Sequence, residues 1–273
     1  MRMRLFPSLG AAVLLAAGAG QLAAQALPTT QPKVLQIFRE RLKPGMSAAH
    51  EKNEIGWPQA FAEAKYPNYY LAVESMTGDP EVLYLAPFDS YTAWGKADAV
   101  IGANATLSAA LDRLAAADAA YVESMDVIEA VAAPELGHGA FPDLNKQRFW
   151  DISVWRIRPG HGKAFAEAVA AYVKVVTRAG GKANWRTYRV TGGMPGGTYL
   201  MFSSVASFAE FDAVMADDAM IGQAMTPDEQ AYFAKFFKES VAYSESNKYR
   251  LSPTMSYVAP ETKAADPAFW NTK

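Results

Sequence analysis

Histidine transfers protons and binds metal ions readily at neutral pH, and this chain has three: His50, His138 and His161. His50 begins the segment HEKNE with Glu51 and Glu54, which superficially resembles a metalloprotease helix. The segment lacks a second histidine four residues on, and the sequence offers no clear third ligand, so we predict no zinc site. His138 lies between two glycines and His161 follows a Pro-Gly pair, and we expect both to be exposed.

Other common signatures of catalysis are missing from the sequence. The absence of cysteine excludes disulfides, thiolate metal sites, iron–sulfur clusters and a cysteine nucleophile. The segment GGMPGG, residues 192–197, lacks the Lys-Ser/Thr ending of a phosphate loop and is predicted to be a hairpin turn. There is no Gly-x-Ser-x-Gly nucleophile elbow. We therefore predict no bound metal and no cofactor.

Aromatic and charged residues alternate with aliphatic ones along several segments that are rich in β-branched and aromatic residues. Because successive side chains of a strand point to opposite faces, this pattern predicts one aliphatic face and one mixed face. We expect Ile37, Ile152 and Val154 to face a layer of helices, and the mixed face to line the space between two sheets. The predicted lining residues are Phe38, Glu40, Tyr70, Glu74, Asp151, Trp155, Trp185 and Arg189.

The charged members of this set decide what such a space could do. A buried carboxylate needs a cation, and Arg189 is the nearest candidate by strand position. If Glu40, Glu74 or Asp151 were left unpaired there, its pKa would be raised and it would be the best candidate for a general base. Two interpretations stay open at this point. The lining could form a ligand pocket, or its side chains could satisfy one another and simply pack.

The segments that carry these residues occur twice. Two predicted strands, 34–42 and 149–157, each lead into a Pro-Gly corner, and Pro159 of the second corner follows Pro44 of the first by 115 residues. Proline fixes φ and glycine turns the chain, so each corner is a suitable turn between a strand and a helix. Apolar residues then recur at helical spacing from Phe165 to Val176, which predicts an amphipathic helix in the second copy.

The first copy is less regular. Ser47 is the predicted N-cap of its helix, and Trp57-Pro58 predicts that this helix is shortened or kinked. Further strands are predicted in both copies, the last of them interrupted by Pro253, which favours an edge or irregular strand. The predicted strands that complete the copies are 69–76, 81–88 and 125–133 in the first, and 184–191, 197–204 and 249–258 in the second.

Each copy has the order β-α-β-β-α-β, which is that of a ferredoxin-like unit. The predicted fold class is therefore α+β, with two tandem ferredoxin-like repeats. The predicted boundaries are a signal peptide at 1–26, a first repeat at 27–133, a linker at 134–148, a second repeat at 149–260 and a C-terminal tail at 261–273.

The Pro-Gly corner, the long helix and a Tyr-Leu pair on the third strand of each copy (Tyr84-Leu85 and Tyr199-Leu200) resemble the dimeric α+β barrel superfamily. Its members include antibiotic-biosynthesis-monooxygenase-like and NIPSNAP proteins, and the resemblance covers residues 34–260. It implies two sheets that close face to face into a barrel, here within one chain. Some members are cofactor-independent oxygenases. In others a histidine ligates haem, and here that residue would be His50 or His161.

The first 26 residues have the composition of an export signal. A positive start, MRMR, precedes an apolar stretch that is short for a membrane span, and AQA at positions 24–26 fits a cleavage site. We predict a periplasmic or secreted protein that begins at Leu27 and has no stable membrane anchor after cleavage. The alternative is an uncleaved anchor.

Composition and charge limit the partners. The chain of 273 residues is 51% hydrophobic and 20% charged, as expected of a soluble globular protein. A net charge of −2 without a basic cluster argues against nucleic acid. We predict a small-molecule-binding or interaction module that takes an apolar or aromatic molecule, as a monomer or weak homodimer. The alternative is a cofactor-independent monooxygenase-like enzyme acting on an aromatic or apolar small molecule.

Overall fold

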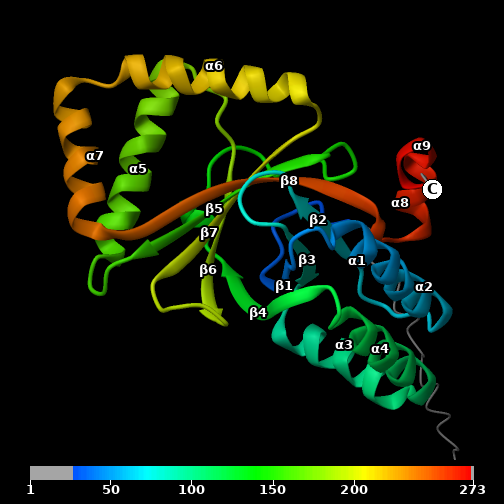
Figure 1. Ribbon diagram of the computed structural model, residues 1–273. Helices are drawn as coiled ribbons and strands as arrows, with labels where there is room; N and C mark the ends of the chain where they lie inside the picture. Colours follow the sequence, from blue (N-terminus) through cyan, green and yellow to red (C-terminus); the bar gives the residue numbers. More distant parts are fainter. Residues whose placement is uncertain (1–26, 272–273) are drawn as a thin grey trace, which may run out of the picture.

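Eight antiparallel strands close into one barrel at the centre of the molecule (Figure 1). The computed structural model describes residues 27–271, so the predicted signal peptide lies outside the described residues. Around the barrel the hydrogen-bonded order is β1-β3-β2-β8-β5-β7-β6-β4. The strands are β1 (Val34–Leu42), β2 (Tyr70–Ser75), β3 (Glu81–Phe88), β4 (Val122–Ala132), β5 (Phe149–Ile157), β6 (Arg186–Gly192), β7 (Thr198–Val205) and β8 (Val241–Tyr257).

Two groups of helices cover different sides of the barrel (Figure 1). The first group belongs to the N-terminal half of the chain and contains α1 (Ser47–Glu54), α2 (Gly56–Glu63), α3 (Tyr91–Ala103) and α4 (Ala105–Asp118). The second contains α5 (Gly162–Ala179), α6 (Phe208–Ala224) and α7 (Pro227–Ser240). A short 3-10 turn, η1 (Pro134–Leu136), follows β4, and α8 (Pro260–Ala265) and α9 (Pro267–Trp270) end the described chain.

The barrel closes because the two halves of the chain pair edge to edge. Within the halves the strand orders are β4-β1-β3-β2 and β8-β5-β7-β6. β2 then pairs with β8, where Val73 lies opposite Leu251, and β4 pairs with β6, where Val131 lies opposite Arg189. These two pairings leave no open sheet edge among the named strands of the described residues. The predicted closed barrel within one chain is confirmed.

The repeated corners form the turns that the sequence predicts. β1 and β5 end just before them, with the predicted bounds, and helices begin just after. Gly45 and Gly160 have φ of 79° and 83°, in the left-handed region that favours glycine. The predicted hairpin at residues 192–197 also connects two strands, β6 and β7.

Local details differ from the sequence-based expectations. The first helix does break, but at Ile55, and Pro58 lies in the first turn of α2, where proline costs no hydrogen bond. Ser47 is not the N-cap, since Met46 holds that position without a side-chain cap. Pro253 lies where the pairing of β8 with β2 shifts register, so the strand is irregular as predicted but does not form an edge.

The barrel interior contains the mainly apolar rows of all eight strands, and this reverses the predicted orientation. Leu35 and Ile37 of β1 pack there with Trp150 and Ile152 of β5, and Ile37 is 2% exposed. The prediction that these rows face the helices is wrong. The predicted alternation of side chains between two faces of each strand is correct. The interior of a closed barrel is surrounded by protein on every side, so the more uniformly apolar face lies there. The outer face of the strands, which mixes aromatic and polar residues, packs against the helices, where polar groups at the edges can still reach solvent.

The predicted C-terminal tail helps to close the barrel. Trp270 of α9 is buried and packs on the interior cluster, and Phe269 packs beside it. Arg148 holds the segment in place through an ion pair with Asp266. Within the part of the chain that the structure describes, no helix is both long enough and apolar enough to cross a membrane.

Candidate functional site

The eight residues predicted to line the space between the sheets are not gathered there. The aliphatic rows point inward, so their neighbours on the same strands point outward, toward the helices or toward solvent. Trp155 and Trp185 pack in the aromatic core beneath α5, with Phe165, and the Trp185 indole donates to the Leu136 carbonyl oxygen at 2.7 Å. These two residues therefore help to pack α5 against the strands of the second half.

The predicted partnership between a buried carboxylate and Arg189 does not form. Arg189 is exposed. Asp151 is half-buried and its Oδ2 lies 2.9 Å from the Lys248 Nζ. Glu74 is half-buried near the charges of Glu51 and Arg250, and its pKa is raised, chiefly by burial.

The remaining three predicted residues lie on the outer face of the first half. Phe38 and Tyr70 pack beside Tyr84. Tyr70 also lines a cavity at one end of the barrel, the only one of the eight to do so in either of the two cavities described below. Glu40 is buried and belongs to the His–carboxylate cluster described next.

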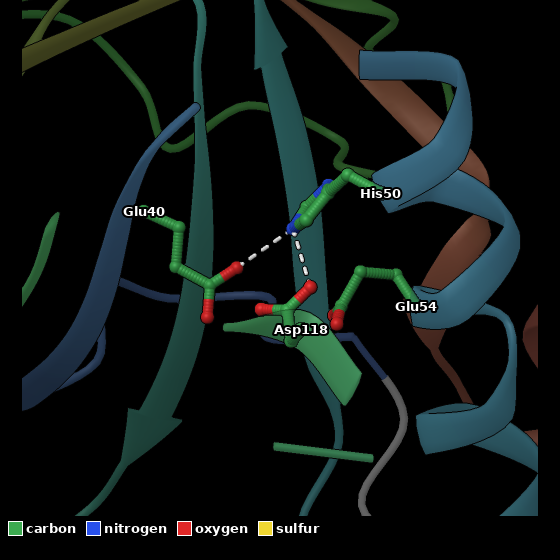
Figure 2. Close-up of side chains that lie close together, drawn as sticks. All are labelled: Glu40, His50, Glu54 and Asp118. Carbon is green, nitrogen blue, oxygen red and sulfur yellow. Dashed lines mark hydrogen bonds and ion pairs between the residues drawn. The ribbon is translucent and has the colours of Figure 1, made fainter. Parts of the chain in front are cut away.

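Four ionisable side chains meet between β1 and the helices α1 and α4 (Figure 2). Glu40 projects from β1, His50 and Glu54 from α1, and Asp118 is the last residue of α4. One ligand-type atom of each lies within 4.8 Å of the others. All four residues are buried, with His50 only 1% exposed and Glu54 3% exposed. We call these four residues the His–carboxylate cluster.

The imidazole of His50 lies at the centre of this cluster. Its Nε2 is 2.9 Å from the Glu40 Oε2 and 3.5 Å from the Asp118 Oδ1 (Figure 2). Asn53 donates to the same oxygen of Asp118 at 3.4 Å. The Glu54 carboxyl interacts with the Tyr84 hydroxyl, yet its Oε1 is buried without a hydrogen-bond partner, as is the Nδ1 of His50.

Burial and mutual repulsion shift the protonation of the cluster. Burial raises the pKa of Glu54 to about 8, with the charges of Glu40 and Asp118 adding to the effect. Burial and the Glu40 charge raise the pKa of Asp118 to about 6. Burial alone would lower the pKa of His50, but its hydrogen bond to Glu40 and the neighbouring carboxylates outweigh this and raise it. No Lys or Arg forms an ion pair with these carboxylates in the described chain.

Sequence reasoning missed this cluster because it looked for ligands along one helix. His50 and Glu54 are four residues apart, a spacing that places both on one face of α1, and this was the available signal. Glu40 lies on β1, the strand that directly precedes α1, but Asp118 reaches the cluster from α4, which is distant along the chain, and nothing near Asp118 in the sequence marks it. His138 and His161 are half-buried rather than exposed, against Trp185 and Ser240 respectively.

A separate apolar cavity of about 100 Å³ lies at one end of the barrel. Its walls come from strands of both halves, including Leu35, Leu85, Trp150 and Phe202. Residues 27–32 and the predicted linker, at 141–144, also line it. A space between the two halves therefore exists, but it is lined by the inward-facing residues rather than by the predicted set.

Polar groups in this cavity are few. Arg186 lines it, and its Nε is buried without a hydrogen-bond partner, while the same guanidinium donates to the Gly139 carbonyl oxygen at 2.7 Å. Tyr188 lines it as well, hydrogen bonded to Gln31, and burial raises the pKa of its hydroxyl. No carboxylate or histidine is among the described residues of the lining.

Deeper in the barrel, a smaller cavity of about 30 Å³ adjoins a charged group. Glu81 is buried, its Oε2 lies 2.7 Å from the Arg39 Nε, and the Tyr249 hydroxyl donates to its other oxygen. Arg39 neutralises this carboxylate, so the arrangement satisfies the pairing that a buried charge requires. The cation is Arg39 rather than the predicted Arg189.

No protein-family model and no curated protein matches the chain, but solved structures share its fold. An anthrone oxidase-like protein is 11% identical with a TM-score of 0.53, covering 84% of this chain and 94% of its own. A Fusobacterium nucleatum protein named as a monooxygenase is 10% identical with a TM-score of 0.51, covering 81% and 92%. These proteins belong to the dimeric α+β barrel superfamily. At such low identity the likeness shows that this chain has the dimeric α+β barrel fold and nothing beyond it.

Proposed function

We propose that this protein binds an apolar or aromatic small molecule in the cavity at the end of the barrel. The observation that carries the proposal is an apolar and aromatic cavity lined by Arg186, a residue whose Nε is buried without a hydrogen-bond partner. Ligand sites typically combine apolar walls with a small number of polar groups that fix orientation. A ligand with a carboxylate, phenolate or carbonyl oxygen would supply the missing acceptor.

The cavity volume limits the size of the ligand. A cavity of about 150 Å³ in another protein binds benzene, so this smaller cavity of about 100 Å³ encloses at most about one aromatic ring or a short apolar chain. Larger molecules would have to extend beyond the cavity. Single-ring acids, phenols and quinones are therefore the first compounds to test.

Ligand binding is tested by comparing two arginines of β6. Trp150 lines the cavity, so ligands such as benzoate, phenol and benzoquinone should change its fluorescence in titrations. Calorimetric titration should detect the same binding. Arg186→Gln should weaken binding of the acid at least about tenfold, because a charge-assisted hydrogen bond contributes roughly 1.5–3 kcal/mol. Arg189→Gln, on the same strand but exposed, should leave binding unchanged.

Tyr188→Phe provides a second comparison, because it removes one hydroxyl and keeps the aromatic wall. It should weaken phenol and benzoate by a few fold and leave toluene unaffected. If none of these compounds binds, or if Arg186→Gln and Arg189→Gln bind equally well, the proposed pocket is not the site.

The second candidate function is a cofactor-independent oxygenase, favoured by the names of the structural neighbours, a monooxygenase and an anthrone oxidase-like protein. Such chemistry requires a base that withdraws a proton from the substrate before oxygen adds. The cavity lining offers tyrosines rather than a carboxylate, and burial raises the pKa of Tyr188, so simple binding has the stronger support. Oxygen consumption and a product heavier by one oxygen atom, with a ligand that binds, would favour the enzyme instead.

We further propose that the barrel arose by tandem duplication of a ferredoxin-like unit, with repeats at 27–133 and 149–260. The matching element and strand orders of the two halves support this. Export, with a mature start at Leu27 and a periplasmic or secreted location, also stays a proposal that rests on the sequence alone. Since no sheet edge of the described strands is open, we propose a monomer or a weak homodimer.

A further inference from the structure

In the described residues, no Lys or Arg side chain balances the carboxylates of the His–carboxylate cluster. Three carboxyl groups and one imidazole lie within 4.8 Å of one another, and the described residues place no Lys or Arg in an ion pair with them. Ionised carboxylates crowded in a buried space repel each other and lose the solvation of water. A bound divalent cation would remove most of that cost at once.

A second observation points to a ligand rather than to a closed hydrogen-bond network. Glu54 is buried, with only 3% of its surface exposed, and its Oε1 has no hydrogen-bond partner. Figure 2 shows its carboxyl group directed toward the other three side chains. Leaving a buried carboxylate oxygen unpaired costs free energy, and a metal ion would satisfy it.

The donor set and its spacing suit a transition-metal ion. Atoms that bind one ion at about 2.1 Å lie about 3.0–4.2 Å from one another. The His50 Nε2 is already 2.9 Å from Glu40 and 3.5 Å from Asp118, so small side-chain movements would complete the site. One imidazole nitrogen with carboxylate oxygens favours zinc, iron or manganese over magnesium and calcium, which prefer oxygen alone.

We propose that Glu40, His50, Glu54 and Asp118 bind one divalent first-row transition-metal ion. The ion has a structural role, because all four ligands are buried and they join three elements: β1, α1 and α4. It holds the two helices against the outer face of the barrel at β1, and one of them, α4, is distant from β1 along the chain. The inference concerns a different place from the proposed ligand cavity, since no residue of the cluster lines that cavity.

The test uses the purified chain after treatment with a chelator and dialysis. Titration with Zn²⁺ should reveal one tight site per chain by calorimetry, and Mn²⁺ should bind the same site more weakly. Mg²⁺ and Ca²⁺ should bind at least about tenfold more weakly than Mn²⁺. An ion at about 100 times its Kd should raise Tm by about 5–10 °C in a chain of this size.

Two substitutions on α1 separate metal binding from folding. Glu54→Gln removes one ligand, so it should weaken Zn²⁺ binding at least about tenfold and reduce the rise in Tm at the same Zn²⁺ concentration by about half or more. The metal-free protein should stay folded by circular dichroism. Glu51→Gln is the matched control, since Glu51 is on the same helix, outside the cluster, and accepts from Thr254. The control should bind Zn²⁺ like the parent.

His50→Gln provides a further readout. Co²⁺ bound by the parent should give a visible absorption spectrum characteristic of nitrogen and oxygen ligands, and this substitution should change it. Absence of stoichiometric binding by Zn²⁺, Mn²⁺ and Co²⁺ would overturn the proposal. So would equal Zn²⁺ affinities of the parent, Glu54→Gln and Glu51→Gln.

Discussion

The stability of the metal-free protein should fall as pH rises, and Glu54 should be the main cause. Its pKa is about 8 in the folded protein against an ordinary value of 4.5. Between these values the folded state binds more protons than the unfolded state, so the free energy of unfolding decreases with pH. Asp118 and His50 also have raised pKa values, so they act in the same direction.

The structure gives the size of this effect. One pKa unit corresponds to about 1.36 kcal/mol, so the window from pH 5 to pH 8 represents on the order of 3–4 kcal/mol for Glu54 alone. Glu54→Gln keeps the shape of the side chain and removes its charge. The substituted protein should lose much less stability over the same window and should be the more stable of the two at pH 8.

The measurement is urea denaturation in the presence of excess chelator at several pH values between 5 and 8. Urea is uncharged, so it does not screen the cluster. Glu51→Gln, on the same helix but outside the cluster, should keep the slope of the parent protein. If Glu54→Gln loses stability with pH as steeply as the parent, the assignment of the effect to Glu54 is wrong.

Three further predictions concern the fold and its processing. Gly193→Ala should destabilise by at least about 2 kcal/mol, since φ is +80° and a Cβ would lie 2.0 Å from the Val127 carbonyl oxygen, whereas Gly196→Ala should be nearly neutral in the same urea assay. Leu251→Ala, in the barrel interior, should cost about 2–5 kcal/mol, and a loss below 1 kcal/mol would contradict the packing described here. Mass spectrometry of exported protein should find Leu27 at the N-terminus, and an intact signal segment on that material would refute cleavage.

Much of the element order could be predicted from local sequence. The strands 34–42 and 149–157 agree with β1 and β5, because their β-branched and aromatic composition and the Pro-Gly corners act over a few residues. The helix that follows Gly160 was predictable for the same reason, since its apolar spacing is a local property.

The cluster and the cavity could not be predicted in the same way. Glu40 was singled out, but for the wrong environment, and Asp118 was not considered. Their meeting depends on how α1 and α4 pack on β1, and α4 is far from the other two elements along the chain. The cavity depends on strands of both halves together with the segment 141–144, which in the sequence is only a linker.

The sequence by itself determined the order of strands and helices, the turns at the repeated corners and the period of two along each strand. Only the tertiary structure decided which strand face points inward. That choice follows from closure, when β2 pairs with β8 and β4 with β6 and the enclosed face is largely removed from water. The mainly apolar rows fill this space because burying them there removes few polar groups from water, and the buried Glu81 is paired with Arg39. The charged residues of the opposite face then meet the helices, and Glu40 meets His50.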